Sequence, residues 1–469
     1  MNKQLRTALL AIGLCASLLC GFLSGCTAPG APGKEDETTL TPPAEDTGLV
    51  LNLYQPHDGK ASLWEALAAD YKNLTGVAIT VHTPENAGEA AARLKEKLEG
   101  EEGAPGIFLF TNPREYKAWK DNALPLNDTE AYMSLLDRRL ALEVDGNAVG
   151  IPLGVEAFGI IYNKAILDRY FALETKDTQF GAADDIKDYK DLEALVKDLD
   201  ANKEALGLNG VFAAPALKAG ESTAWTTRLL SVPVGYEYEN KRVDITGEGI
   251  DELKLRYGAG YKGFAELYYG YSTAAEGFET RAYADAVKEF ATAKAAMILG
   301  STDFTGLLNS TVGQTVSAGD TAFLPAYMNI EDVKSQGIAF ETVEYAAINA
   351  QGAPEQREAA AAFLDWLVTS EKGKDFLATK LNFIAPYNGV STTNLPNNPL
   401  ADDAFGWLQK EGVDNAVTYS VLSPGEQFRD KVMAEGIAKY AKGESTWEQF
   451  REDLAAGWKT ERAKVEENW

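Results

Sequence analysis

Short apolar runs alternate with longer amphipathic stretches from residue 49 onward. Three of the runs, 49–54, 77–81 and 107–110, have the length and the strand-forming residues of buried strands. Because helical stretches and short links separate them, the pattern predicts a parallel sheet covered by helices on both faces. Ligands of such sheets bind beyond the carboxyl ends of the strands. Two polar segments, 55–58 and 111–114, follow the first and third strands and are expected at that edge.

The amphipathic stretches have the period of helices. A capping box of Ser62 and Glu65 predicts the start of the first helix, and Gly76 its end. Residues 89–98 and 359–370 are expected to be helical as well. Apolar side chains recur at helical spacing in further stretches, which is typical of helices that cover a core. These stripes are Trp64, Leu67, Ala68, Tyr71 and Leu74; Tyr261, Phe264, Leu267, Tyr268 and Tyr271; Phe428, Val432, Met433, Ile437 and Tyr440; and Trp447, Phe450, Leu454 and Trp458.

One apolar run, GIPLGVEAFGIIYNK at residues 150–164, contains a single acid. Its branched and aromatic residues predict a strand, and Asn163 is expected to cap a helix over 164–170. Glu156 lies near the middle of the run, where a carboxylate is costly to bury without a partner. Local sequence alone leaves two interpretations open, a charge on a solvated strand face or a functional acid.

Charge and composition exclude several classes of function. The net charge of −26 repels nucleic acid and anionic lipid headgroups. The chain has only two histidines, His57 and His82, so no histidine-rich metal site and no cofactor is expected. All three cysteines lie within the first 26 residues, and the remainder therefore forms no disulfide and carries no thiolate chemistry.

The N-terminus has the pattern of a targeting segment. Two basic residues precede the apolar run 8–23, which is short for a membrane span. The tetrapeptide Leu23-Ser24-Gly25-Cys26 resembles the lipobox of bacterial lipoproteins, with an ordinary secretory leader or a retained anchor helix as the alternatives. The resemblance implies a signal peptide at 1–25, a lipid on Cys26 and attachment to the extracytoplasmic face of a bacterial cell membrane. Residues 26–48 have the composition of a flexible tether.

The sequence contains no motif that marks a catalytic centre. The G-x-G-x-x-G run at 258–263 follows a charged segment rather than an apolar strand, which argues against a dinucleotide site. Zinc-protease, phosphate-loop and serine-hydrolase motifs are missing. A glycosidase needs two carboxylates across a cleft, and no feature marks such a pair among 70 acids. The protein is therefore not expected to be an enzyme.

Several short motifs occur in a characteristic order along the chain. They are LTGVAITV at 74–81, PGIFLF at 105–110, ALPLND at 123–128, the run at 150–164, KAAM at 294–297, AAINA at 346–350 and FLDWL at 363–367. In this order they resemble the family 1 extracellular solute-binding proteins of bacterial ABC importers. The resemblance covers most of residues 49–458.

The resemblance implies an α/β, two-lobed periplasmic-binding-protein fold of type II, in which crossover strands join the lobes. Lobe one is expected to comprise 49–155 and about 328–386, and lobe two 156–327 and 387–469. A sugar or oligosaccharide would bind between the lobes and favour the closed state, which docks on the transmembrane subunits of an ABC permease.

The resemblance also implies which residues bind the ligand. Glu156 matches the acid that accepts sugar hydroxyls, Phe110 a cleft aromatic and Trp225 a stacking aromatic of the second lobe. The implied ligand-binding positions are Gln55, His57, Phe110, Asn112, Arg114, Glu156, Trp225 and Asp303.

One position departs from the family pattern. After the KAAM motif the family often has an aromatic residue, whereas this chain reads GSTDF at 300–304, with Thr302 in place of the ring and Asp303 adding a charge. This departure argues against a maltodextrin as the ligand. Glu156 and Asp303 together keep a second hypothesis open, in which the same fold binds a polyamine, an amino-sugar acid or another polar solute. A surface glycan hydrolase is the third.

Overall fold

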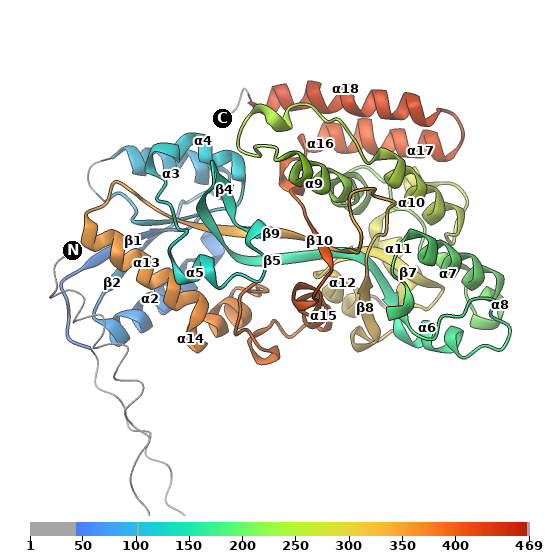
Figure 1. Ribbon diagram of the computed structural model, residues 1–469, viewed down its shortest axis with the longest axis horizontal. Coiled ribbons are helices and arrows are strands. Elements are labelled where there is room, and N and C mark those ends of the chain that lie inside the picture. The colour runs from blue at the N-terminus through green and yellow to red at the C-terminus, as the bar shows by residue number, and fades with distance from the viewer. Residues whose placement is uncertain (1–43, 101–102, 467–469) are drawn as a thin grey trace, which may run out of the picture. The chain divides into compact units, whose positions relative to one another are not determined.

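The structure is a computed structural model that describes residues 44–100 and 103–466 (Figure 1). The predicted signal peptide, Cys26 and most of the predicted tether lie outside the described residues. The end of the tether, 44–48, runs along the carboxyl end of the first long helix. There the amide of Ala44 donates to the carbonyl of Asn73 at 2.9 Å, and Asp46 pairs with Lys72 at 3.0 Å.

A ten-stranded mixed sheet runs through the protein in the order β2-β1-β3-β9-β5-β7-β6, with β4 and β8 paired to β5 and β10 paired to β9. The strands are β1 (Val50–Tyr54), β2 (Ala78–His82), β3 (Ile107–Phe110), β4 (Leu142–Val144), β5 (Asn147–Asn163), β6 (Gly210–Phe212), β7 (Ala295–Ser301), β8 (Thr321–Leu324), β9 (Gln336–Ile348) and β10 (Asp414–Val417).

Helices cover both faces of this sheet. They are α2 (Ala61–Thr75), α3 (Ala90–Glu99), α4 (Tyr116–Trp119), α5 (Glu130–Met133), α6 (Lys164–Phe171), α7 (Tyr189–Ala201), α8 (Lys203–Leu206), α9 (Leu229–Lys241), α10 (Gly258–Gly270), α11 (Tyr283–Ala291), α12 (Phe304–Ser310), α13 (Pro354–Thr369), α14 (Glu371–Asp375), α15 (Pro399–Gln409), α16 (Gly425–Gln427), α17 (Glu435–Ala441) and α18 (Trp447–Glu466).

Two long strands, β5 and β9, connect the two halves of the sheet. They pair along their middles, from Ile151 opposite Ala346 to Phe158 opposite Ala339. Figure 1 shows β1 and β2 with α2, α3, α13 and α14 at one end of these strands, which we call the first lobe. At the other end, the second lobe, lie β7 and β8 with α6, α7, α8, α10 and α11. The expected two-lobed α/β fold with crossover strands is confirmed, whereas the residue boundaries of the lobes stay a prediction.

The expectation of a parallel sheet is wrong for the centre of the molecule. β1 runs parallel to β2 and β3, as the alternation of strands and helices predicts. However, β9 runs antiparallel to both β3 and β5. The reason is geometric, because β5 leaves the first lobe and β9 returns to it, so the two crossing strands have opposite directions.

Each face of the sheet carries its own core. Alternate side chains point to opposite faces of a strand, and β3 accordingly sends Phe108 and Phe110 into one core cluster and Ile107 and Leu109 into the other. Both clusters contain residues of both lobes, including Phe158 of β5 in the first cluster. The lobes therefore share their cores through the sheet.

The helix ends match the sequence predictions unevenly. Asn163 caps α6 as expected, since its side-chain oxygen accepts from the amide of Ile166 at 3.2 Å. The prediction that Ser62 and Glu65 form a capping box is wrong. The helix α2 begins at Ala61 after a 3-10 turn, and Lys60 occupies the cap position without a side-chain hydrogen bond. The G-x-G-x-x-G run lies in the first turns of α10, as a helical segment.

Candidate functional site

Strands of both lobes end at the middle of the crossing strands. The carboxyl end of β3, Phe110, lies opposite Tyr345 of β9, and Tyr345 in turn lies opposite Pro152 of β5. From the other lobe, the carboxyl end of β7, Ser301, lies opposite Phe158 of β5. The carboxyl ends of strands are where ligands of α/β sheets bind. Glu156 lies between these two points and is the centre of the candidate site.

A pocket of about 230 Å³ opens beside Glu156. We call it the interlobe pocket, because its walls come from β5 and β9, the end of β7, the segment after α14 in the first lobe and the start of α15 in the second. It is lined by Val155, Glu156, Thr302, Asp303, Val343, Leu381, Asn382, Phe383, Ile384, Pro396, Asn398 and Ala401. It thus combines one aromatic ring with carboxylate and amide groups.

Second-lobe polar groups are held in place by local hydrogen bonds. Asn398 caps α15 by accepting from the amide of Leu400 at 3.0 Å, and its side-chain amide donates to the carbonyl of Thr302 at 2.6 Å. The hydroxyl of Ser301 donates to Asp303. Asp303 is exposed, and among the described residues no cation lies within ion-pair distance of it. A ligand in the pocket therefore meets a carboxylate that is still open to solvent.

Glu156 is half-buried and is paired with an arginine of the second lobe. Nη2 of Arg228 donates to Oε2 of Glu156 at 2.5 Å. Arg228 ends a π-helical turn, Ala224–Arg228, that runs directly into α9. The acid of the crossing strand is thereby connected to a second-lobe helix.

A second acid, Glu341 of β9, lies directly opposite Glu156 in the ladder. Like charges at opposed positions of neighbouring strands repel each other. Burial raises the pKa of Glu341, while the charge of Arg228 and bonds from the Ser420 hydroxyl (2.5 Å) and the Val421 amide (3.1 Å) offset part of this rise. Burial alone would lower the pKa of Arg228, but the charges of Glu156 and Glu341 more than compensate and raise it. Arg228 therefore pairs with Glu156 and its charge also favours the ionised form of Glu341.

A third acid lies further along β9, on the side of the first lobe. Glu344 is 1% exposed at its side chain and contacts Nε2 of His57 at 3.2 Å and Nζ of Lys60 at 3.6 Å. The ammonium of Lys60 also lies 4.6 Å from the centre of the Phe383 ring. The loop after β1 is thus fixed to the crossing strand and to the aromatic wall of the interlobe pocket.

The two predicted aromatic ligands lie in the core. Trp225 is 2% exposed and packs edge-to-face on Tyr268, with ring centres 4.7 Å apart. Phe110 is fully buried and stacks on Tyr345 at 5.1 Å. Neither ring lines the interlobe pocket.

The predicted polar residues of the first lobe fold its loops. Gln55 is fully buried, donates to Thr83 at 2.5 Å and accepts from the amide of His57 at 3.0 Å. Asn112 accepts from the amide of Arg114 at 3.0 Å. Arg114 is 2% exposed, donates to the carbonyl of Gly247 in the second lobe, and has a pKa lowered by burial. Of the eight predicted ligand residues, the structure brings Glu156 and Asp303 into one pocket, and the ligand roles of all eight stay predictions.

Sequence reasoning missed Arg228, Glu341, Glu344 and Phe383. For the two acids the signal was present, because the run GIAFETVEYAAI at 337–348 places acids in an apolar strand just as the run around Glu156 does. Arg228 and Phe383 have no comparable local signal, since each is recognisable only by its contact with a distant strand.

The described residues contain no cluster of three or more histidine, cysteine or acidic side chains able to hold a metal ion. Within the same part of the chain, no helix is long and apolar enough to cross a membrane.

A sheet shared by two lobes, crossed by two long strands and hollowed by a polar pocket at the crossing, defines the class of two-lobed solute-binding proteins. The chain belongs to the family of bacterial extracellular solute-binding proteins, whose family model matches residues 66–405. The resemblance inferred from the sequence motifs is thereby confirmed. The family is one of binding proteins.

Solved structures of this class share the fold at low sequence identity. A family 1 extracellular solute-binding protein from Bifidobacterium longum subsp. infantis is 14% identical, with a TM-score of 0.59 over 89% of this chain and 100% of that chain. The apo-form of RafE from Streptococcus pneumoniae is 14% identical, with a TM-score of 0.59 over 88% and 98%. The cyclic alpha-maltosyl-1,6-maltose binding protein from Arthrobacter globiformis is 14% identical, with a TM-score of 0.55 over 88% and 99%. No curated protein matches the chain.

Proposed function

We propose that this protein binds a sugar in the interlobe pocket and delivers it to the transmembrane subunits of an ABC permease. The observation that carries the proposal is the pocket itself, where the ring of Phe383 lies together with Glu156, Asp303 and Asn382. A sugar presents an apolar ring face and a rim of hydroxyls, which suit an aromatic side chain and planar polar groups respectively. The name of the structural relative from Arthrobacter globiformis, a binding protein for a cyclic maltose derivative, is in keeping with this ligand class.

The volume of the pocket favours a small ligand. About 230 Å³ is below the usual range of drug-sized ligand pockets. We therefore infer that a mono- or disaccharide fits better than a long chain. The absence of an aromatic residue after the KAAM motif, where Thr302 stands, points the same way, because long glucans stack on several rings.

Ligand binding is coupled to lobe closure in this proposal. Phe383 belongs to the first lobe, Asp303 follows a second-lobe strand, and Glu156 lies on the strand between them. A sugar that contacts all three interacts more strongly with the closed than with the open arrangement. It therefore shifts the population toward closure by that difference in affinity.

A polar cationic solute is the second candidate for the same pocket. It is favoured by the exposed carboxylate of Asp303, but Glu156 and Glu341 already share the charge of Arg228. Because these acids are compensated within the protein, we favour a neutral sugar.

The proposal includes attachment to the membrane. Residues 1–25 act as a signal peptide, Cys26 carries the lipid and the residues up to 43 hold the lobes off the membrane surface. This part rests on the lipobox-like tetrapeptide and on the extracellular family.

Thermal-shift measurements with a panel of mono- and disaccharides test the proposal. At least one sugar is expected to raise the melting temperature of the protein, because a ligand that binds only the folded state stabilises it. With that sugar, calorimetry on Glu156→Gln should show roughly a ten- to hundredfold loss of affinity, since a charged acceptor is replaced by a neutral one.

The matched control is Glu435→Gln, which makes the same change in an exposed pair with Lys431 outside the pocket and should leave affinity unchanged. Absence of any sugar-induced shift, or equal affinity in Glu156→Gln and the unaltered protein, would contradict the proposal.

A further inference from the structure

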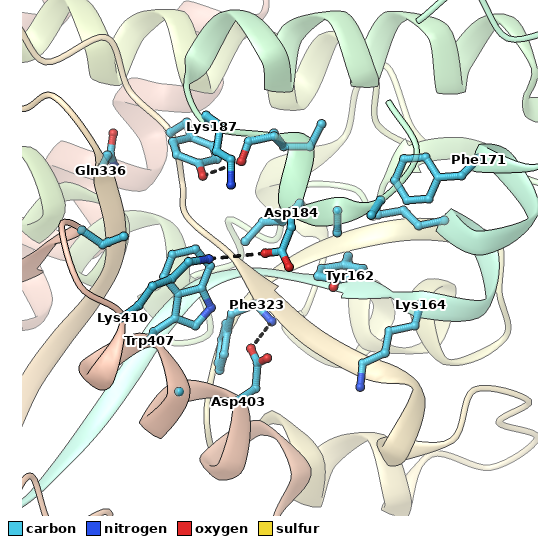
Figure 2. A pocket seen from close by; sticks show the side chains of 18 of the residues that line it. Tyr162, Lys164, Phe171, Asp184, Lys187, Phe323, Gln336, Asp403, Trp407 and Lys410 are labelled. Carbon is cyan, nitrogen blue, oxygen red and sulfur yellow. Dashed lines mark hydrogen bonds and ion pairs between the residues drawn. The ribbon is translucent and has the colours of Figure 1, made fainter. Parts of the chain in front are cut away.

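A larger hollow lies in the second lobe and shares no residue with the interlobe pocket. Its volume is about 570 Å³, and it is bounded by the end of β5, α6, the segment 181–187, β8 and α15. We call it the α15 groove. Figure 2 shows that Tyr162 lies at its floor, Trp407 on one wall and Phe171 on the other. The groove therefore has aromatic walls as well as charged groups.

One of the three lysines that line the α15 groove holds its ammonium group against an aromatic ring. Nζ of Lys410 lies 4.2 Å from the centre of the Trp407 ring and 3.3 Å from Oδ1 of Asp184 (Figure 2). An aromatic face and a carboxylate are together the usual recognition elements for an organic cation. The ammonium group of Lys410 thus lies where an organic cation from solution would find both an aromatic ring and a carboxylate.

Further acids in the α15 groove lack a cation. Within the described part of the chain, no lysine or arginine lies within ion-pair distance of Asp168, Asp402 or Asp403. The nearby Lys164 instead donates to the carbonyl of Gly319 at 3.1 Å. With Asp168, Asp184, Asp402 and Asp403 against three lysines, the lining of the groove therefore has one acid in excess.

Asp403 is the best placed of these acids. Its Oδ2 accepts from the amide of Phe323 on β8 at 2.7 Å, which fixes the carboxylate of α15 beside β8 in the lining of the groove. Burial raises the pKa of Asp403, although the Phe323 amide and the charges of Lys164 and Lys410 offset part of the rise. A cation bound beside it would stabilise the charged form that burial penalises.

We propose that the α15 groove binds an organic amine with more than one ammonium group. One ammonium takes the place of Lys410 between Trp407 and Asp184, another pairs with Asp403, and the carbon chain lies along the ring of Tyr162. Lys410 is the resident cation that the amine displaces. This site is separate from the interlobe pocket and does not depend on the sugar proposal.

Other ligands fit the groove less well. A neutral sugar would stack on Trp407, but the ammonium of Lys410 lies over that ring. An anion would meet four carboxylates, Asp168, Asp184, Asp402 and Asp403, against three lysines. The resident cation and the excess of acids both favour an amine.

Calorimetric titration of the protein with spermidine at low ionic strength tests the proposal. The unaltered protein should bind it, and Lys410→Ala should bind it roughly fivefold more tightly, because the competing ammonium is gone. Asp403→Asn keeps an acceptor for the Phe323 amide and should weaken binding by a similar, roughly fivefold factor.

Lys95→Ala is the matched control, since it removes one lysine charge from the exposed face of α3 and should leave binding unchanged. Equal gains in Lys95→Ala and Lys410→Ala would assign the effect to net charge and overturn the proposal. Failure of Asp403→Asn to weaken binding would do the same. Loss of spermidine binding in Glu156→Gln would place the amine between the lobes and would likewise refute an α15 site.

Discussion

Glu156 is one member of an opposed pair of acids on the crossing strands. Its neighbour Glu341 is half-buried, and the charge of the same guanidinium, that of Arg228, acts on both. Removing one partner of a buried ion pair is far more destabilising than removing both, because a bare charge is left behind. The arrangement therefore has a stability role in addition to its place in the interlobe pocket.

Arg228→Met is expected to lower the unfolding free energy at pH 7 by roughly 2–4 kcal/mol, because it leaves Glu156 and Glu341 without a cation. Adding Glu156→Gln to this variant should recover part of the loss. Urea denaturation of the two single variants and the double variant measures the coupling. Arg93→Met, which breaks only exposed pairs with Glu89 and Glu96, should be nearly neutral; similar losses in Arg93→Met and Arg228→Met would contradict this account.

Single residues show which features of a site local sequence can indicate and which it cannot. Glu156 was recognisable because an acid interrupts an apolar strand. Trp225 and Phe110 were placed at the ligand by resemblance, yet their rings pack on Tyr268 and Tyr345, which come from distant segments. Whether an aromatic ring faces a ligand or a core depends on such partners, and local sequence does not contain them.

Among the elements, β5 determines how closely the first lobe approaches the pocket. Its pairing with β9 is irregular around Gly154, and the amide of the next residue, Val155, donates to the carbonyl of Ile384 at 2.9 Å. A side chain at Gly154 would meet the Cβ of Phe383 at 2.5 Å. The missing side chain is therefore what allows Phe383 to form the pocket wall.

Gly154→Ala is expected to destabilise the protein by about 1–3 kcal/mol, because Phe383 or the strand must move. It should also weaken ligand binding, since Phe383 belongs to the pocket. Gly306→Ala is the control: Gly306 lies within α12, and apart from the neighbouring backbone of its own helix no atom lies within 4 Å of the added carbon, so this change should stabilise by about 0.5–1 kcal/mol. Chemical denaturation of both variants checks the opposite signs, and a neutral or stabilising Gly154→Ala would show that the contact is not tight.

The order of elements was largely predictable from periodicity. The predicted strands at 49–54, 77–81 and 107–110 correspond to β1, β2 and β3. The helix start at Ser62 was wrong because a 3-10 turn precedes α2, and such a turn has no pattern in the sequence. The antiparallel pairing at the centre of the sheet was also missed. The direction of a strand follows from the connections between strands and not from the local pattern of apolar residues.

At the scale of the whole molecule, several acids have a pKa raised by burial, and an acid that keeps its proton adds no negative charge. Burial raises the pKa of Glu115 to about 7, although amides of Asn112 and Thr111 offset part of the effect. Burial likewise raises the pKa of Glu237, Glu341 and Asp365. The folded state therefore retains protons that the unfolded chain releases.

The free energy of unfolding is accordingly expected to fall as pH rises. A carboxyl group whose folded pKa is raised contributes its full stability below the unfolded value and loses it as pH passes the folded value. For Glu115 this window runs from 4.5 to about 7, with a loss of roughly 3 kcal/mol across it. Denaturation at pH 5 and pH 8 measures the difference.

Glu115→Gln isolates the contribution of this residue. The amide oxygen still accepts from Asn112 and Thr111 but does not ionise, so the variant should be more stable than the unaltered protein at pH 8 and similar at pH 5. A variant whose pH dependence equals that of the unaltered protein would show that Glu115 does not titrate in this window.

The unbroken sheet has a consequence for chimaeras. β5 and β9 start and end in different lobes, so a lobe transplanted from a relative brings only one end of each strand, and their ladder must be joined in register at the middle. A slip of one residue in that ladder turns every side chain to the opposite face. Glu156 would then point into the core that holds Val155 and Ala157. The unit that relatives of this protein can exchange is therefore the matched pair of crossing strands, and not a lobe.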